Sequence, residues 1–498
     1  MTSEQADVAV VGGGLAGMAA AWRLAERGCK VTIYEASQRM GGKAGATRVG
    51  TDYEEHGYHI FPRWYLNTLR LMREVGIAER LVDSGDVALL EPGAFPRMRI
   101  QRDLTAISSA WSNITGGLLP PPEMFLFYYS TLDLMSQPYY RRAYLDQITL
   151  TGFMRSRFYR TEGVIGMYQE LMLKGISVPA WMVSAMTTQN VMRYWMKVGK
   201  PMVRILDGNL QERFIEPIVD KLAGLGCRFE MQRRLVRVEV ANGVASRLHF
   251  VLPTGETREV EASHVILALP AERLAALVDD DLYRAAPSLG QVQNLRVRPM
   301  AALNVYFKRR LEGIPKQHVS LVGSKHGLSF IDVSQRWPGY PNTVLNLIAS
   351  EFSDLQGLSK ASVEGVLLDE LRGYMPNFDL EDVERTYCQP HVEAPLYMND
   401  AGSWFFRLEA ATEANNLFVA GDHCRSHVDL VSMEGAVSTG LTAAEAVRKK
   451  LGLEDPIEVE VPPTFPRGLF MLAKAALLPL ALFAKALTFL WHRPVSPT

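Results

Sequence analysis

Cysteine is scarce in this sequence, and its N-terminal end has no long apolar run. The 498 residues include four cysteines, which lie far apart and form no Cys-x-x-Cys pair. This spacing indicates neither a disulfide framework nor a metal site. The chain opens with MTSEQADVAV, which contains acidic residues and lacks the pattern of a secretory signal. We therefore expect the protein on the cytoplasmic side.

An excess of charge of either sign is also missing. The 53 lysines and arginines nearly balance the 54 aspartates and glutamates, for a net charge of −1. No overall field favours nucleic acid, so no nucleic-acid partner is expected. Repeats and low-complexity segments are absent from the sequence. The length and the 48% hydrophobic content suit more than one core, which predicts two interleaved or successive domains.

A glycine-rich turn stands near the start of the chain. Residues 7–11 are apolar and β-branched, which predicts a buried strand, and a helix and a second strand follow. The turn after the first strand has G-x-G-x-x-G spacing, with Gly12, Gly14 and Gly17. Such glycines let the backbone approach a pyrophosphate at a helix N-terminus. Glu35, at the end of the second strand, is suited to accept hydrogen bonds from ribose hydroxyls, which favours FAD or NAD over NADP.

A second glycine motif distinguishes FAD from NAD. The segment after Glu35 resembles the second glycine motif of the flavin amine oxidoreductase superfamily, through Arg39, Gly41, Gly42 and Lys43. The resemblance implies that the paired glycines bring backbone close to the flavin side of FAD. It also implies that the two basic side chains face phosphate.

A matching signal lies near the far end of the chain. Residues 417–420 predict a strand, Gly421 and Asp422 end it, and residues 432–447 predict a helix. The helix opens with Met433, Glu434, Gly435 and Ala436. A helix N-terminus aimed at a flavin stabilises the negative charge that gathers at its N1–C2=O edge. Asp422 is suited to bond a ribityl or phosphate-linked hydroxyl, and Leu235 to touch adenine through its backbone.

These signals predict an α/β fold with a Rossmann-like FAD-binding domain built from split segments. We assign residues 1–90, 205–270 and 410–450 to it. Residues 91–204 and 271–409 should form an interleaved α+β substrate domain that faces the membrane. The aromatic and methionine-rich composition of the first of these segments suits either an ordinary core or a tunnel for a lipid.

Two longer segments carry a more specific resemblance. EHGYHIFPRWYLNTLRLMREVGI (residues 55–77) and ILDGNLQERFIEPIVDKL (205–222) are similar to segments of plant and cyanobacterial-type phytoene and ζ-carotene desaturases. The resemblance implies noncovalent FAD, removal of two hydrogens from a long isoprenoid, and reoxidation by a quinone or oxygen. It also implies that Glu55 and His59 lie beside the isoalloxazine, and that Arg213 orients a quinone carbonyl or stabilises reduced flavin.

Several alternatives stay open for these residues. Arg213 also suits a helix-surface salt bridge with Glu212 or Glu216, and His59 suits a satisfied core position. His56 should point away from the flavin if its segment is a strand. His423 and Cys424 depart from the desaturase pattern, which puts the exact substrate in doubt.

Two other activities of the same scaffold are alternatives to desaturation. A flavin amine oxidase on a hydrophobic amine needs aromatic side chains at the flavin, which residues 404–406 (Trp-Phe-Phe) are suited to supply. A non-redox isomerase of a polyene would use reduced FAD without net turnover of an acceptor.

The C-terminal tail, residues 464–498, has its own signal. Residues 467–493 contain about 20 apolar positions, enough to span a bilayer as a helix. Arg467, Lys474, Lys485 and His492 fall on one line of such a helix. The stripe predicts a peripheral, monotopic helix in the membrane interface, with its lysines reaching anionic headgroups. A spanning anchor and a helix packed on the protein's own surface are the alternatives.

Overall fold

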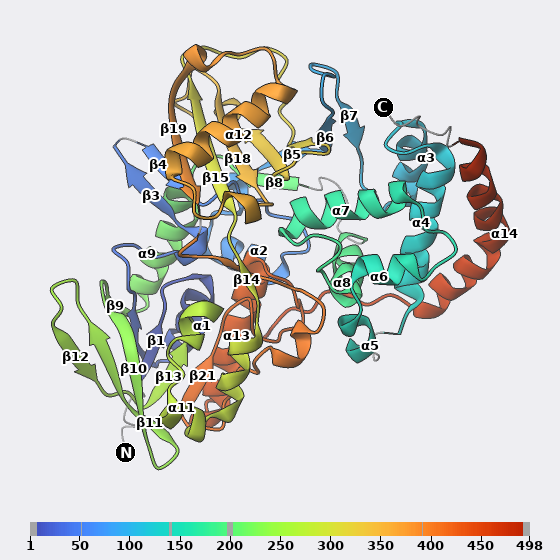
Figure 1. Ribbon diagram of the computed structural model, residues 1–498. Coiled ribbons are helices and arrows are strands. Elements are labelled where there is room, and N and C mark those ends of the chain that lie inside the picture. Colours follow the sequence, from blue (N-terminus) through green and yellow to red (C-terminus); the bar gives the residue numbers. More distant parts are fainter. Residues whose placement is uncertain (1–6, 51, 139–141, 197–202, 391, 492–498) are drawn as a thin grey trace.

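Three regions make up the molecule (Figure 1). The computed structural model describes residues 7–50, 52–138, 142–196, 203–390 and 392–491. A parallel sheet with its helices lies at the lower left of Figure 1, a larger mixed sheet at the top, and a group of helices at the right. The site described below lies where these regions meet.

The parallel sheet is assembled from distant segments of the chain. Its strand order is β21-β13-β1-β2-β9, with β1 (Asp7–Val11), β2 (Lys30–Tyr34), β9 (Arg228–Glu230), β13 (His264–Leu267) and β21 (Leu417–Val419). The helices α1 (Leu15–Ala25) and α13 (Met433–Leu451) pack against each other beside it. All its neighbouring strands run parallel, as expected for βαβ units with buried apolar strands. The predicted α/β fold built from split segments is confirmed.

A small antiparallel sheet packs on the other side. It contains β10 (Arg234–Ala241), β11 (Val244–Val251) and β12 (Thr257–Val260). The helices α10 (Ala271–Ala275) and α11 (Asp280–Ala285) share one apolar core with it and with the parallel sheet. Residues 271–295 therefore pack with the parallel-sheet region, although the sequence analysis assigned them to the substrate domain.

The larger sheet has seven strands in the order β19-β15-β18-β17-β16-β6-β7. Their bounds are β6 (Val87–Leu90), β7 (Arg99–Gln101), β15 (Ala301–Phe307), β16 (Val319–Leu321), β17 (Leu328–Asp332), β18 (Val344–Ala349) and β19 (Val383–Pro390). The helix α12 (Lys360–Tyr374) covers one face through an apolar core. Because β6 pairs in parallel with β16, residues 87–90 belong here and not to the segment 1–90 assigned to the FAD domain.

The third region is helical. It contains α3 (Ile107–Thr115), α4 (Pro121–Ser136), α5 (Arg142–Gln147), α6 (Leu150–Arg155), α7 (Glu162–Ile176) and α8 (Ala185–Trp195). Side chains of Thr149, Thr161 and Ser184 cap the starts of α6, α7 and α8. The core of this region continues without a break into the core around α1 and α13.

Shorter elements join the three regions. They are β3 (Ala46–Val49) with β4 (Asp52–Glu55), β5 (Leu81–Gly85) with β8 (Val203–Leu206), β14 (Val297–Arg298) with β20 (Leu396–Tyr397), α2 (Leu66–Val75) and α9 (Glu216–Gly224). A π-helical turn, Gln211–Ile215, precedes α9.

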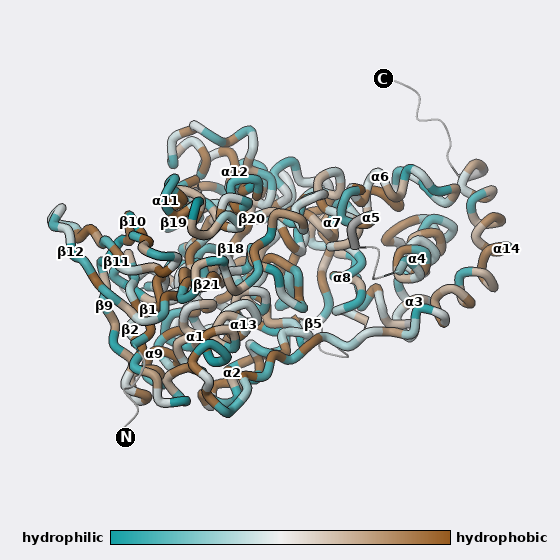
Figure 2. The backbone as a smooth tube through the Cα atoms, turned by 90° about the horizontal axis from the view of Figure 1, so that it is seen from below, coloured by the Kyte–Doolittle hydropathy of each residue, from teal (hydrophilic) through white to brown (hydrophobic). Residues whose placement is uncertain are grey.

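The tail helix α14 (Arg467–Trp491) lies along α4 at the edge of the molecule, as Figures 1 and 2 show. Its basic side chains point toward the protein. Lys474 Nζ lies 2.6 Å from the Asp133 carboxylate, and Arg467 and Lys485 donate to the backbone carbonyls of Ser136 and Arg160. The prediction that the lysines of this helix reach lipid headgroups is wrong, because Lys474 binds the buried Asp133 carboxylate and Lys485 binds the Arg160 carbonyl. His492 lies outside the described residues.

Candidate active site

A cavity of about 830 Å³ opens where the parallel strands end and where α1 and α13 begin, and we call it the glycine-lined cavity. Both helix N-termini border it, so their unpaired backbone N–H groups favour a negatively charged ligand. Among the residues singled out in the sequence, its lining includes Gly12, Gly14, Glu35, Arg39, Gly41, Gly42, Lys43, Leu235, Gly421, Asp422, Met433 and Ala436. Residues as far apart in the sequence as Gly12 and Ala436 therefore meet at one site.

The first two glycine motifs touch each other. Gly41 N–H donates to Gly13 O at 2.8 Å. Gly12 has a φ of +114°, and a Cβ there would lie 2.2 Å from Ala268 O. Gly17 does not line the cavity; a Cβ there would lie 2.0 Å from Gly12 O, so its role is to let α1 pass close to the turn.

Glu35 closes one side of the cavity. Its carboxylate accepts hydrogen bonds from Gly13 N at 2.7 Å and from Ser37 N at 2.8 Å. A carboxylate has about four acceptor positions, so capacity is left for hydroxyl groups of a ligand. Leu235, at the start of β10, lines the same cavity.

Glu434 serves the scaffold. Its buried carboxylate accepts hydrogen bonds from the backbone N–H groups and side chains of Asn67 and Thr68, at the start of α2. Burial raises its pKa to about 7. Gly435 donates its N–H to the Ser432 hydroxyl, which caps α13. Neither Glu434 nor Gly435 lines the cavity, so only Met433 and Ala436 of this motif do.

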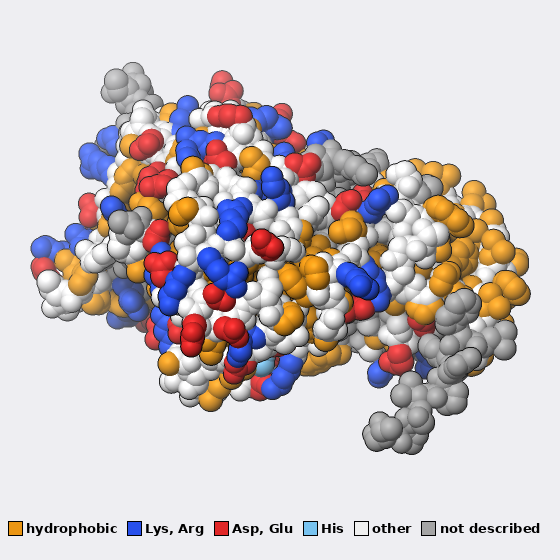
Figure 3. Space-filling view, turned by 90° about the horizontal axis from the view of Figure 1, so that it is seen from above, with side chains coloured by type: hydrophobic (Ala, Val, Ile, Leu, Met, Phe, Trp, Pro, Cys, Tyr) orange, Lys and Arg blue, Asp and Glu red, His pale blue; other side chains and the backbone are white. Residues whose placement is uncertain are grey.

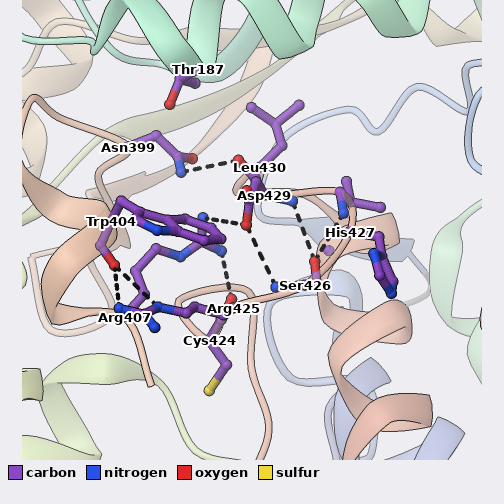
Figure 4. Close-up of polar contacts among 12 residues, drawn as sticks. Thr187, Asn399, Trp404, Arg407, Cys424, Arg425, Ser426, His427, Asp429 and Leu430 are labelled. Carbon is purple, nitrogen blue, oxygen red and sulfur yellow. Dashed lines mark hydrogen bonds and ion pairs between the residues drawn. The ribbon is translucent and has the colours of Figure 1, made fainter. Parts of the chain in front are cut away.

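Arg407 holds the loop between β21 and α13 (Figure 4). Its guanidinium donates to the carbonyls of Asp422 and Cys424 at 3.0 and 2.6 Å and pairs with Asp429 at 3.3 Å. Both charged side chains are buried. No local pattern in the sequence points to Arg407, since its partners lie 15 to 22 positions later.

The two residues that depart from the desaturase pattern lie in the interior. His423 and Cys424 are fully buried and line neither of the large cavities. Burial lowers the pKa of His423 to about 3 and raises the pKa of the Cys424 thiol. Both side chains are therefore neutral packing groups near neutral pH.

A second cavity of about 580 Å³ adjoins the first, and we call it the apolar cavity. The lining residues common to both are Tyr58, Ile60, Tyr65, Gly175, Ile176, Ser177, Val431 and Ser432. Its other walls come from α7, α8 and one face of the seven-stranded sheet, and include Trp64, Leu104, Leu118, Met167, Met172, Met192 and Trp195. The methionines and aromatics of the middle segment thus form both a core and a cavity wall.

Two histidines border the glycine-lined cavity. His59 Nδ1 lies 2.9 Å from Gly57 O, and burial lowers its pKa to about 4, so its imidazole is neutral. His56 lines the same cavity, contrary to the sequence expectation. That expectation assumed a strand, but β4 ends at Glu55, so side chains no longer alternate beyond it.

Glu55 and Arg213 lie outside both large cavities. Glu55 is buried, and its carboxyl accepts the Leu210 N–H at 2.7 Å. Arg213 Nε lies 3.6 Å from the Asp207 carboxylate, and its side chain covers Gly208. This ion pair differs from the expected partners Glu212 and Glu216. The positions give Glu55 and Arg213 scaffold roles and offer no support for catalytic ones.

Replacing Glu55 with glutamine should stabilise the protein at high pH. Burial raises the pKa of Glu55 to about 8, so the folded protein keeps a proton that the unfolded chain releases above about pH 4.5. The contribution of Glu55 to the free energy of unfolding therefore falls as pH rises from about 4.5 to 8. In thermal unfolding, Glu55→Gln should match the wild type near pH 5 and melt a few degrees higher near pH 8. The exposed control Glu381→Gln should melt like the wild type at both pH values. A Glu55→Gln melting temperature that differs from the wild type by the same amount at both pH values would contradict the raised pKa of Glu55.

The aromatic segment Ser403–Phe406 does not reach either cavity. The carbonyl of Trp404 accepts from Arg425, whose guanidinium also lies 5.1 Å from the Trp404 ring centroid. These residues therefore do not form the aromatic cage that the amine oxidase hypothesis predicts. Trp64, Tyr65 and Tyr194 pack together at the junction of the cavities instead.

The parallel sheet and the glycine-lined cavity define a Rossmann-like nucleotide-binding fold with an apolar cavity beside the site. The family model described as flavin containing amine oxidoreductase matches residues 15–448, and the chain belongs to that family. It is therefore a flavin-dependent oxidoreductase.

Curated relatives carry desaturase names. The chain is 26% identical over 459 residues to a 15-cis-phytoene desaturase of Synechococcus elongatus, covering 88% of this chain and 95% of that protein. It is 22% identical over 483 residues to a zeta-carotene desaturase of Synechocystis, covering 88% and 96%. The resemblance to carotenoid desaturases found in the sequence is confirmed.

Solved structures share the fold. An oxidoreductase from Methanosarcina mazei has a TM-score of 0.68 at 16% identity, covering 88% of this chain and all of that one. A putrescine oxidase bound to putrescine has a TM-score of 0.66 at 15% identity, covering 90% and 99%. At these identities the likeness concerns the fold alone.

Proposed function

We propose that the protein is an FAD-dependent desaturase that removes two hydrogens from a C–C unit of a lipophilic isoprenoid. The observation that carries this proposal is the apolar cavity that opens into the glycine-lined cavity through shared residues. The desaturase names of the relatives agree with it. The flavin is FAD, held noncovalently, and a quinone or oxygen is the final acceptor.

The glycine-lined cavity fits FAD as its cofactor. Gly12 and Gly14 leave backbone open beside the α1 N-terminus for the pyrophosphate, and Glu35 keeps acceptor positions for the ribose. Leu235 borders the adenosine end, and Met433 borders the flavin end at the α13 N-terminus. Bound FAD supplies a two-electron acceptor that takes hydrogen as hydride.

The residues around the junction orient the substrate and keep water away. The eight residues shared by the two cavities carry no charged side chain, so no ionised protein group stands beside the reacting carbon at the junction. His59 Nδ1–H donates to Gly57 O, which leaves Nε2 of the neutral imidazole as a hydrogen-bond acceptor for a ligand group.

The substrate is lipid-soluble, and the enzyme meets it at a membrane surface from the cytoplasmic side. The described residues contain one helix, α14, that is long and apolar enough to cross a bilayer. Only 11% of its apolar stretch is buried against the rest of the protein. Figure 3 shows hydrophobic side chains gathered at the end of the molecule that α14 forms. With its basic side chains bound to the protein, α14 presents an apolar face, which suits peripheral insertion into the interface.

Anaerobic reduction of the flavin tests the proposed activity. Purified protein is mixed without oxygen with liposomes that contain phytoene, ζ-carotene or squalene, and the visible flavin band is followed. We expect one isoprenoid to bleach it and an added quinone to restore it. Bleaching by amines alone would identify an amine oxidase instead. Conversion of a polyene isomer by protein whose flavin has been reduced beforehand, with the flavin staying reduced, would identify the isomerase. Flavin released by denaturation should be FAD.

A further inference from the structure

One wall of the apolar cavity carries polar side chains. It is the face of the seven-stranded sheet that α12 does not cover, and it presents Gln101 from β7 and Ser320 from β16 to the cavity. In the sheet register Gln101 faces Val87 and Ser320 faces Leu89, so β6 separates the two polar positions by about 10 Å between strands. Neither lines the glycine-lined cavity, so both lie away from the junction.

These two side chains lack partners within the described part of the chain. Gln101 is 8% exposed and Ser320 is 5% exposed, yet no described residue forms a hydrogen bond with the Gln101 carboxamide or the Ser320 hydroxyl. Their polar atoms are also not sealed inside the protein, since they keep surface on the cavity. A buried carboxamide without a partner is unfavourable, so its presence in an apolar wall calls for a polar group in the cavity.

Two other polar groups of the same cavity are already paired. Lys174 donates to Glu170 and to the Leu321 carbonyl. The Tyr58 hydroxyl lies 2.6 Å from His318 Nε2. The Trp64 indole N–H also lacks a partner among the described residues, but it has no exposed surface. Gln101 and Ser320 are therefore buried lining residues whose polar atoms stay open to a ligand.

We propose that the lipid bound in this cavity has an oxygenated end group, a hydroxyl or carbonyl, that bonds to Gln101 or Ser320. The inference rests on the proposed function for the identity of the cavity as the substrate site. The carboxamide of Gln101 both donates and accepts, and the hydroxyl of Ser320 does the same, so either oxygen type is recognised. A plain hydrocarbon leaves both groups unpaired and binds more weakly.

A matched pair of ligands tests this inference. Geranylgeraniol and the same C20 polyene without the hydroxyl are titrated into the flavoprotein in one detergent, and quenching of tryptophan fluorescence reports binding, because Trp64 and Trp195 line the cavity. The wild type should bind the alcohol about tenfold more tightly. Either Gln101→Met or Ser320→Ala should reduce that preference toward one without weakening hydrocarbon binding. The control Leu118→Met, which changes shape but not polarity, should keep it.

Two results would overturn the inference: equal binding of both ligands by the wild type, or a preference that neither variant lowers. Either would mean that trapped water satisfies Gln101 and Ser320. Flavin spectra and melting temperatures verify that the variants are folded. Preference for the alcohol without flavin bleaching by any isoprenoid would sink the proposed desaturase activity and keep this inference. Bleaching by a hydrocarbon with no preference for the alcohol would do the reverse.

Discussion

Replacing two outward-facing residues of α14, in the variant Leu472→Glu with Phe483→Glu, should release the protein from lipid vesicles and leave its flavin spectrum unchanged. Leu472 is 70% exposed and Phe483 is 62% exposed. Burying such a side chain in an apolar phase is worth about 1.5–3 kcal/mol, so losing both and adding two charges should lower vesicle binding at least about a hundredfold. Sedimentation with vesicles measures it.

The orientation of α14 adds a lipid dependence to this result. Because Arg467 and Lys474 are bound to α4, vesicles of phosphatidylcholine alone should bind the protein nearly as well as vesicles containing phosphatidylserine. The conservative control Leu472→Met with Phe483→Leu keeps the face apolar and should sediment like the wild type. Unchanged sedimentation of the glutamate variant, or binding that requires anionic lipid, would contradict membrane insertion through this face.

The tail helix shows what helical periodicity predicts and what it does not. Helical periodicity alone placed Arg467, Lys474 and Lys485 on one stripe, and the structure keeps them on one side of α14. Which way the stripe faces depends on Asp133, which lies 341 positions before Lys474. Asp133 also accepts hydrogen bonds from Arg157 and Tyr159. No local pattern contains such a long-range pairing, so the sequence favoured lipid headgroups as partners.

The cofactor region was predictable because its signals are local. A turn with G-x-G-x-x-G spacing fixes where Gly12 and Gly14 lie relative to the strand before them and the helix after them. The contacts of residues at the end of a helix or strand were harder to predict. His56 depends on where β4 ends, and Glu434 faces α2 because a helix start there needs an acceptor for its free N–H groups. Such choices arise from tertiary contacts, which the motif does not specify.

Replacing Arg407 with methionine should strip the protein of flavin and destabilise it. Methionine fills much of the space but leaves the Asp429 carboxylate buried without its cation, and it removes the donor to the carbonyls of Asp422 and Cys424. Breaking one side of a buried ion pair typically costs about 3–5 kcal/mol. Since Asp422 lines the glycine-lined cavity, a loosened loop loses a cofactor contact. The ratio of flavin absorbance to protein, with the melting temperature, measures both effects.

A second variant separates charge from loop geometry. Adding Asp429→Asn to Arg407→Met removes the carboxylate that has lost the Arg407 guanidinium but does not restore the carbonyl contacts, so melting temperature should recover in part while flavin content stays low. Arg425→Met is the matched control. Arg425 belongs to the same loop, but its contacts are a surface ion pair with Glu409 and bonds to the Trp404 and Phe405 carbonyls, which do not line the cavity, so flavin content should stay full. The ion pair itself is worth at most about 1 kcal/mol. Full flavin content in Arg407→Met would mean that the loop keeps its shape without the guanidinium. A full recovery of flavin in the double variant would assign the whole effect to the buried charge, and Arg407 would then be needed only because Asp429 is there.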